Sequence, residues 1–322
     1  MMTLNRLSCI ILLIVLSSLS VVGISAQEAD CPTDDFIDVQ AAPENSAYPA
    51  PELSVECTED SIIVTSNGIP NFEFLQTTPN ALTAQNFVWE IPLEPTLAEE
   101  TTQIPILGTV AFAVNGIPIY GPNEAPQMDY GDPFLDELLD YCNGHTGGTG
   151  DYHFHVVPSC IFEEYDGNVG LVVAYALDGF PILAPFLCTD DDCTDFVELN
   201  SSWQRTTDVR NAWEAHEYIE GSGDLDQCNG MMMDDGSYAY FATATFPYFL
   251  ACYVGEVDES ITAQNAGGLP QGGEQGGQGQ QGQPPQDGQQ PTQDGQDGRG
   301  QGDGQRPPDG GNGNGGGQGG RP

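Results

Sequence analysis

Three of the four histidines of this chain lie within eleven residues of one another, at His145, His153 and His155. The last two are separated by one residue, so in an extended strand both imidazoles point to the same face. The glycine-rich stretch at residues 147–150 suits a tight reversal, which would return His145 to the side of that pair. Neutral imidazoles are good ligands for Zn²⁺, Cu²⁺, Ni²⁺ and Fe²⁺ and poor ligands for calcium. The segment therefore predicts a transition-metal site, with zinc or copper as the expected ion.

Three histidine ligands leave one position of a zinc ion open, which is typical of catalytic rather than closed structural sites. Asp140, Asp151 and Tyr152 are candidates for a fourth ligand, or for a contact that fixes an imidazole tautomer. We expect negative charge around the site to raise the histidine pKa values, so that protons compete with the metal at acidic pH. No nucleophile or general base stands out beyond these residues, so catalysis is an alternative and no catalytic residue is assigned.

Part of the chain repeats itself. The stretch VAFAVNGIPIYGP at 110–122 recurs as VAYALDGFPILAP at 173–185, and each copy predicts a β-hairpin with a type I′ turn. Further on, LDYCNG at 139–144 recurs as LDQCNG at 225–230. We interpret these matches as an internal duplication that forms a pseudo-symmetric, β-rich fold.

The repeat supplies an internal control for the histidines. In the second copy the three histidine positions hold other residues, namely Met231, Ala239 and Phe241. The cysteine, the Asn-Gly pair and the tyrosine are kept in both copies. Residues that the fold needs should persist in both, so the joint loss of the histidines favours one shared function in the first copy.

Four segments differ in composition. Residues 1–26 have the pattern of a secretory signal peptide, with Arg6 ahead of a short apolar run. Residues 27–56 predict an extended lead-in, and residues 57–257 predict one mainly β domain with few helices. The strongest helix candidate is 208–218, with Asp208 as the N-cap. Residues 266–322 are rich in Gly, Gln and Pro and too poor in apolar residues to form a core, so we expect a disordered tail.

Eight cysteines remain after the signal peptide, and an even number in an exported chain favours disulfides. Sequence neighbours are expected to pair, and two of the pairs fall at matching places in the repeat. The expected pairs are Cys31–Cys57, Cys142–Cys160, Cys188–Cys193 and Cys228–Cys252.

The chain is strongly acidic, with 48 Asp and Glu residues, no lysine and a formal net charge of -42. Such a surface repels nucleic acid and anionic membranes and attracts cations. No stretch after the signal peptide is apolar enough to span a membrane. We therefore expect a secreted protein that binds no nucleic acid, while a protein or glycan partner is not identified.

The hexapeptide Gly-Asp-Tyr-His-Phe-His at 150–155 follows a Cys-Asn-Gly-His segment and an Asn-Gly-x-Pro-Ile-Tyr-Gly-Pro hairpin. Together these motifs resemble the YHYH domain family, which is named after its tetrapeptide. The resemblance covers roughly residues 55–255 and implies an exported or surface protein, but no reaction. It departs at Phe154, where the family usually has tyrosine, which argues against an obligatory chemical role for that position.

We therefore expect a secreted domain that binds a transition metal through its three clustered histidines. The first alternative is an extracellular metal-dependent enzyme, a hydrolase or an oxidase, that uses the same ligands. The second is a surface adhesion or glycan-binding module, in which Tyr120, Tyr141 and Tyr152 would stack on sugar rings.

Overall fold

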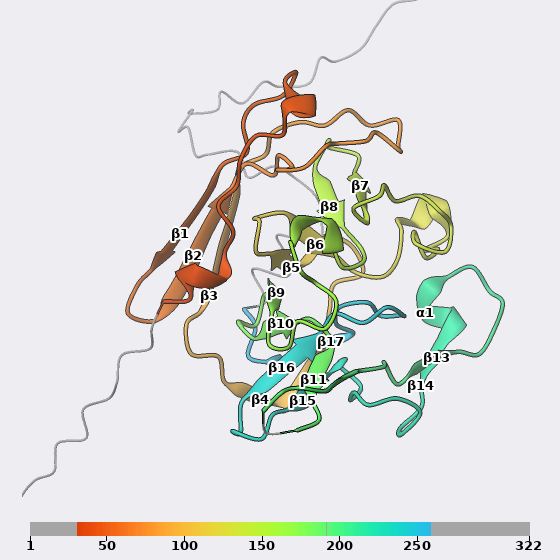
Figure 1. Cartoon of the computed structure of the whole chain (residues 1–322). Coiled ribbons are helices and arrows are strands. Elements are labelled where there is room, and N and C mark those ends of the chain that lie inside the picture. The colour runs from red at the N-terminus through yellow and green to blue at the C-terminus, as the bar shows by residue number, and fades with distance from the viewer. Residues whose placement is uncertain (1–30, 191, 259–322) are drawn as a thin grey trace, which may run out of the picture. The chain divides into compact units, whose positions relative to one another are not determined.

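The computed structural model describes residues 31–190 and 192–258, and this part of the chain is mainly β (Figure 1). It has seventeen strands and one short α-helix, so the predicted fold class is confirmed. The expected signal peptide at 1–26 and the expected tail at 266–322 lie outside the described residues.

The strands are β1 (Leu53–Cys57), β2 (Ser61–Ser66), β3 (Phe87–Pro92), β4 (Leu97–Gln103), β5 (Thr109–Ala113), β6 (Pro118–Tyr120), β7 (Gly144–Thr146), β8 (Tyr152–Phe154), β9 (Val172–Ala176), β10 (Pro181–Leu183), β11 (Phe186–Cys188), β12 (Phe196–Glu198), β13 (Trp203–Arg205), β14 (His216–Tyr218), β15 (Gly230–Met232), β16 (Tyr238–Phe241) and β17 (Cys252–Gly255). The helix is α1 (Ala212–Ala215), and the 3-10 turns are η1 (Thr33–Asp35), η2 (Pro43–Asn45), η3 (Pro126–Met128) and η4 (Ser159–Ile161).

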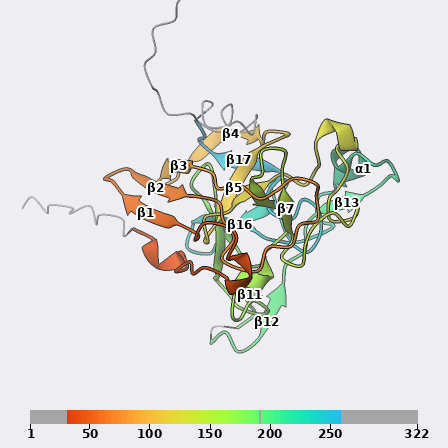
Figure 2. The same cartoon turned by 90° about the horizontal axis from the view of Figure 1, so that it is seen from above.

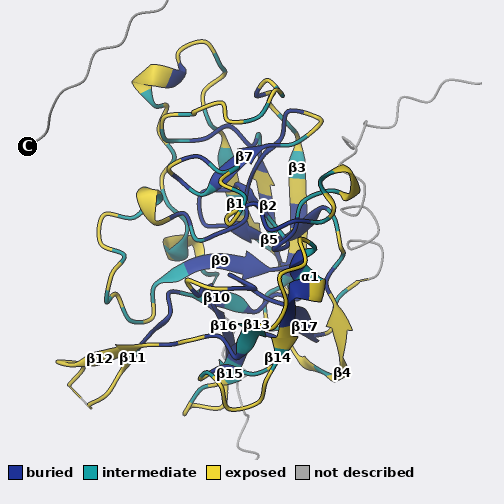
Figure 3. Cartoon of the chain, turned by 90° about the vertical axis from the view of Figure 1, so that its right-hand side faces the viewer, coloured by how far each residue is buried: buried dark blue, intermediate teal, exposed yellow. Residues whose placement is uncertain are grey.

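Eight strands form the central sheet, in the order β15-β16-β10-β9-β5-β6-β8-β7. The middle strands β5 and β9 are antiparallel to each other and almost wholly buried (Figure 3). Each forms a hairpin with the next strand, β6 or β10, which then pairs in parallel with β8 or β16. The strand order is therefore symmetric about the centre, and the histidine hairpin β7–β8 forms one edge. The duplication itself stays a prediction.

The two predicted hairpins at 110–122 and 173–185 are present, but their turns are not of type I′. Gly116 and Gly179 have positive φ angles of 77° and 90°, whereas the preceding Asn115 and Asp178 do not. A type I′ turn needs positive φ at both central residues, so the predicted turn type is wrong. The hydrogen bonds instead close a three-residue loop in which only the glycine is left-handed.

The helix expected over 208–218 is also wrong in its length and its cap. Only Ala212–Ala215 are helical, and the side chain of Asn211 accepts the N-cap hydrogen bonds in place of Asp208. The chain then becomes extended and pairs as β14 with β13. This strand pairing outweighs the helical pattern, because it lets Tyr218 pack against Trp203.

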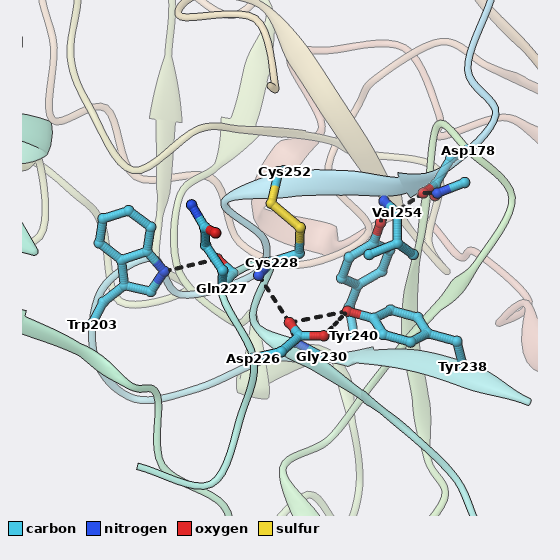
Figure 4. Close-up of a disulfide and its surroundings, with 11 residues drawn as sticks. Asp178, Trp203, Asp226, Gln227, Cys228, Gly230, Tyr238, Tyr240, Cys252 and Val254 are labelled. Carbon is cyan, nitrogen blue, oxygen red and sulfur yellow. Dashed lines mark hydrogen bonds between the residues drawn. A yellow bond between two sulfur atoms is a disulfide. The ribbon is translucent and has the colours of Figure 1, made fainter. Parts of the chain in front are cut away.

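All four expected disulfides are present, with Cα–Cα distances between 4.7 and 5.9 Å. The Cys142–Cys160 bond joins the segment before β7 to η4 after β8, so it closes the ends of the histidine hairpin. In the other half of the sheet, Cys228–Cys252 joins the segment before β15 to β17 (Figure 4). Four disulfides are consistent with folding in an oxidising compartment.

A second sheet, of β1, β2 and β3, packs beside the central one (Figure 2). The contact includes Trp89 of β3, which stacks on Phe112 of β5 with ring centroids 4.8 Å apart. Phe36 of the lead-in stacks on Tyr175 of β9. The boundary that we expected between residues 56 and 57 falls inside β1.

A carboxylate is buried where the two hairpins of the second half meet. Asp178 has no exposed surface, and its Oδ2 accepts hydrogen bonds from the Tyr240 hydroxyl at 2.6 Å and the Gly255 N–H at 2.9 Å. Burial raises the pKa of this carboxyl above its usual value, although the hydrogen bonds oppose the rise. The corresponding residue in the first hairpin is the neutral Asn115.

We expect Asp178→Asn to keep the contacts with Tyr240 and Gly255, since an amide oxygen accepts the same bonds, to lose only the 3.4 Å bond that the Phe180 N–H donates to Oδ1, and to remove the cost of burying a charge. A raised folded-state pKa means that wild-type stability is fully present below the unfolded pKa and falls as pH rises through the folded value. The stability of the variant should therefore rise relative to that of the wild type as pH increases above the unfolded-state pKa of about 3.9. Urea unfolding midpoints of both proteins check this, and a gap that does not change with pH contradicts it.

Candidate metal centre

The hairpin β7–β8 brings the three histidines together. The strands are antiparallel, and their register places His145 directly opposite His153, while His155 follows the end of β8. One ring nitrogen of each histidine lies within 4.8 Å of those of the other two. The three residues are only 4%, 3% and 2% exposed, respectively. A tetrahedral zinc sets its nitrogen ligands about 3.4 Å apart, so a bound ion would draw these rings slightly closer.

The glycine-rich reversal that the sequence predicts lies between the two strands. The N–H of Gly147 donates to the carbonyl of Asp151, and the N–H of Gly150 donates to the carbonyl of Gly147. Gly150 has a φ of 80°, which a glycine adopts without strain. The reversal thus sets the register that pairs the histidines.

Hydrogen bonds fix the tautomers of His153 and His155. The Nδ1 of His155 lies 2.7 Å from the carbonyl oxygen of Gly121, and the Nδ1 of His153 lies 3.2 Å from that of Asp151. A carbonyl oxygen only accepts, so each Nδ1 carries the proton and each Nε2 keeps a lone pair. The Nε2 of His155 is buried and has no hydrogen-bond partner. This is the arrangement of a metal-binding histidine held by an outer contact.

His145 faces an acid that the sequence analysis missed. Its Nε2 lies 3.2 Å from Oε1 of Glu124, and its Nδ1 is buried without a hydrogen-bond partner. Glu124 reaches the site because β6 pairs in parallel with β8 and the chain continues past the rings. Glu124 lies two residues past the end of the repeat at 110–122, so the comparison of the two copies does not reach it.

Burial sets the protonation of the histidines. It lowers the pKa of His145 to about 3 and that of His155 well below its usual value, and the charge of His153 adds to both shifts. The expected upward shift is therefore wrong for these two residues, because the cost of burying a charged ring outweighs the nearby acids. Both rings are neutral near neutral pH, which is the form that binds a metal ion.

Asp151 contacts His153 from the side away from the cluster. Burial raises the pKa of Asp151, but hydrogen bonds from His153, Thr149 and Tyr120 outweigh burial and lower it. The Tyr120 hydroxyl donates to Oδ2 at 2.8 Å, and its ring stacks on His153 at a centroid distance of 3.9 Å. Tyr120 corresponds to Leu183 in the second copy, so it is absent where the histidines are absent.

Asp140 and Tyr152 contact each other. The Tyr152 hydroxyl lies 2.9 Å from both oxygens of Asp140, and Tyr152 is fully buried. The same contact recurs between Tyr238 and Asp226 in the hairpin without histidines (Figure 4). The fold therefore accounts for the Asp140–Tyr152 contact without a metal.

The described residues contain no helix with the length and apolar character needed to cross a bilayer. No curated protein and no solved structure gives a significant match to the chain. A family described as YHYH protein matches residues 88–255, which is more than half of the 322 residues and includes both hairpins with their repeats. The chain therefore belongs to the YHYH family.

Proposed function

We propose that this protein is a secreted domain that binds one transition-metal ion through His145, His153 and His155. The observation that carries the proposal is that one ring nitrogen of each of these buried histidines lies within 4.8 Å of those of the other two, while His145 Nδ1 and His155 Nε2 have no hydrogen-bond partner. An unsatisfied buried polar atom costs about 1–3 kcal/mol, and a bound ion would satisfy both nitrogens at once.

The local charge also favours a cation. Glu124 and Asp151 are two acids beside the rings, and their only ion-pair partners among the described residues are His145 and His153. Buried charge is costly unless it is paired or coordinates a metal. A divalent ion at the centre would offset both carboxylates, and the acidic surface would raise its local concentration.

The donor set indicates zinc or divalent copper. Three imidazole nitrogens form an incomplete shell that leaves one position open, and Glu124, whose Oε1 lies 3.2 Å from His145 Nε2, adds an acid beside that shell. Asp151 would act from outside that shell by holding Nδ1–H of His153.

An extracellular metal-dependent enzyme, hydrolase or oxidase, is the alternative function that uses the same ligands. It would require turnover that depends on the added ion. The adhesion alternative loses one of its three sugar-stacking surfaces, because Tyr152 is fully buried, whereas Tyr141 is 53% exposed.

Metal content tests the proposal. We expect the mature chain, loaded with Zn²⁺ or Cu²⁺ and then dialysed against excess Mg²⁺ to clear surface carboxylates, to retain about one equivalent. The combined variant His145→Met, His153→Ala and His155→Phe carries the residues of the second hairpin and should retain none. Its circular dichroism spectrum should match that of the metal-free wild type. A wild type without bound metal, or a variant with equal content, contradicts the proposal.

A further inference from the structure

A cavity of about 580 Å³ opens onto the histidine rings. The rings of His145, His153 and His155 form part of its lining, and Glu124 stands beside them. Its size lies within the range of about 300–1,000 Å³ that is usual for small-molecule sites. The cavity is thus large enough to hold an organic molecule in addition to an ion.

The lining combines unpartnered polar atoms with apolar side chains. Four buried side-chain atoms lack hydrogen-bond partners in the described part of the chain, and three of them belong to Glu124, His145 and His155. The lining also includes the apolar side chains of Ile106, Leu107, Met128 and Leu138.

Two polar side chains of the wall, Asn123 and Thr78, are already bonded within the protein. Asn123 donates to the carbonyl of Ile106 and accepts from the indole N–H of Trp213, and the Thr78 hydroxyl contacts Thr146. The buried polar atoms of the lining that lack a partner are therefore those of Glu124, His145 and His155.

The cavity is reachable from solvent. Its lining runs from the buried histidines to an exposed rim that includes Ile106, which is 50% exposed, and Gly148. An exposed Ile beside a cavity offers apolar area to an incoming molecule. The cavity thus extends from the buried rings to the protein surface.

We propose that this cavity binds a small organic molecule with an oxygen-donor head group and an apolar body about the size of one aromatic ring. The head group coordinates the metal at the position that the three histidines leave open, and the body lies against Ile106, Leu107 and Met128. This inference rests on the metal site proposed above and adds the chemical class of its ligand.

Two hydroxamates test the inference, because they share a metal-binding head and differ in their body. In the Co²⁺-loaded protein we expect benzohydroxamate and acetohydroxamate both to change the visible absorption spectrum. Burial of the ring should make benzohydroxamate bind at least about tenfold tighter. Metal content after gel filtration controls for removal of the ion by the probe.

A substitution at Gly148, on the rim, tests binding of the organic ligand separately from binding of the metal. A Cβ at Gly148 meets no atom within 4 Å, and the residue has no positive φ, so a side chain fits there without backbone strain. We expect Gly148→Phe to keep one equivalent of Co²⁺ and to lose the preference for benzohydroxamate. Gly148→Ala, which adds only a methyl group, should keep the preference.

The outcomes are distinguishable. Protein that holds no Co²⁺ overturns the metal site and this inference with it. Protein that holds Co²⁺ but binds both hydroxamates equally, or keeps its preference in Gly148→Phe, leaves the metal site standing and overturns the ligand site.

Discussion

Replacement of His155 by Phe is expected to weaken Zn²⁺ binding by more than about 100-fold. Loss of an outer contact to a metal-binding histidine costs about 10–100-fold, and loss of the ligand itself should cost more. The Nδ1–H of His155 is held by the carbonyl of Gly121, so the ring that the variant loses is already oriented for the ion. Phe241 occupies the corresponding position in the second hairpin, which indicates that this part of the fold accepts a phenyl ring.

The fourth histidine provides the matched control. His216 is 9% exposed, its Nδ1 lies 2.7 Å from the carbonyl of Ala212, and its ring stacks on Phe246. It therefore resembles His155 in burial and in its backbone contact, but it lies outside the cluster. We expect His216→Phe to bind Zn²⁺ with wild-type affinity.

Competition with a chromophoric chelator measures both affinities, and thermal unfolding gives an independent readout. Zinc at 100 times its dissociation constant should stabilise the wild type by about 2.7 kcal/mol, and His155→Phe should lose this gain. Equal affinities for the wild type and His155→Phe, or equal losses in the two variants, would exclude His155 as a ligand.

Local signals predicted the arrangement of the histidines correctly. The two-residue spacing of His153 and His155 and the glycines of the reversal act within one hairpin, so the sequence contains all that is needed to place them. The disulfides also join neighbours along the chain, at separations of 5 to 26 residues. Cysteines that are close in sequence meet easily, so pairing between neighbours was a sound expectation from the sequence alone.

Contacts between distant segments were not predicted. Glu124 and Tyr120 reach the site through the pairing of Ile119 with Phe154, which joins segments 35 residues apart. The direction of the histidine pKa shifts depends on burial, which the surplus of acidic residues in the composition does not reveal. The prediction of a helix over 208–218 failed for a similar reason. The end of this segment, β14, pairs with β13, and the local helical pattern does not show that pairing.

The histidine hairpin also depends on a glycine that makes no contact with a metal. A Cβ at Gly144 would lie 2.5 Å from the ring of Tyr152 and 2.6 Å from the backbone oxygen of His153. The ring cannot withdraw freely, since its hydroxyl is bonded to Asp140, and the oxygen belongs to the paired strand. The second hairpin has the same restriction at Gly230, where a Cβ would lie 2.2 Å from the Tyr238 hydroxyl oxygen.

We therefore expect Gly144→Ala to destabilise the metal-free protein by about 3 kcal/mol, at the upper end of the cost of overpacking a core. Gly148→Ala, in the same hairpin, should stay within about 0.5 kcal/mol of the wild type, because its Cβ meets open space. Urea unfolding of both variants tests this, and equal stabilities would contradict it. Since Gly144 precedes His145 in β7, the variant that folds should also bind metal more weakly, because a shift of the strand moves that ring away from His153.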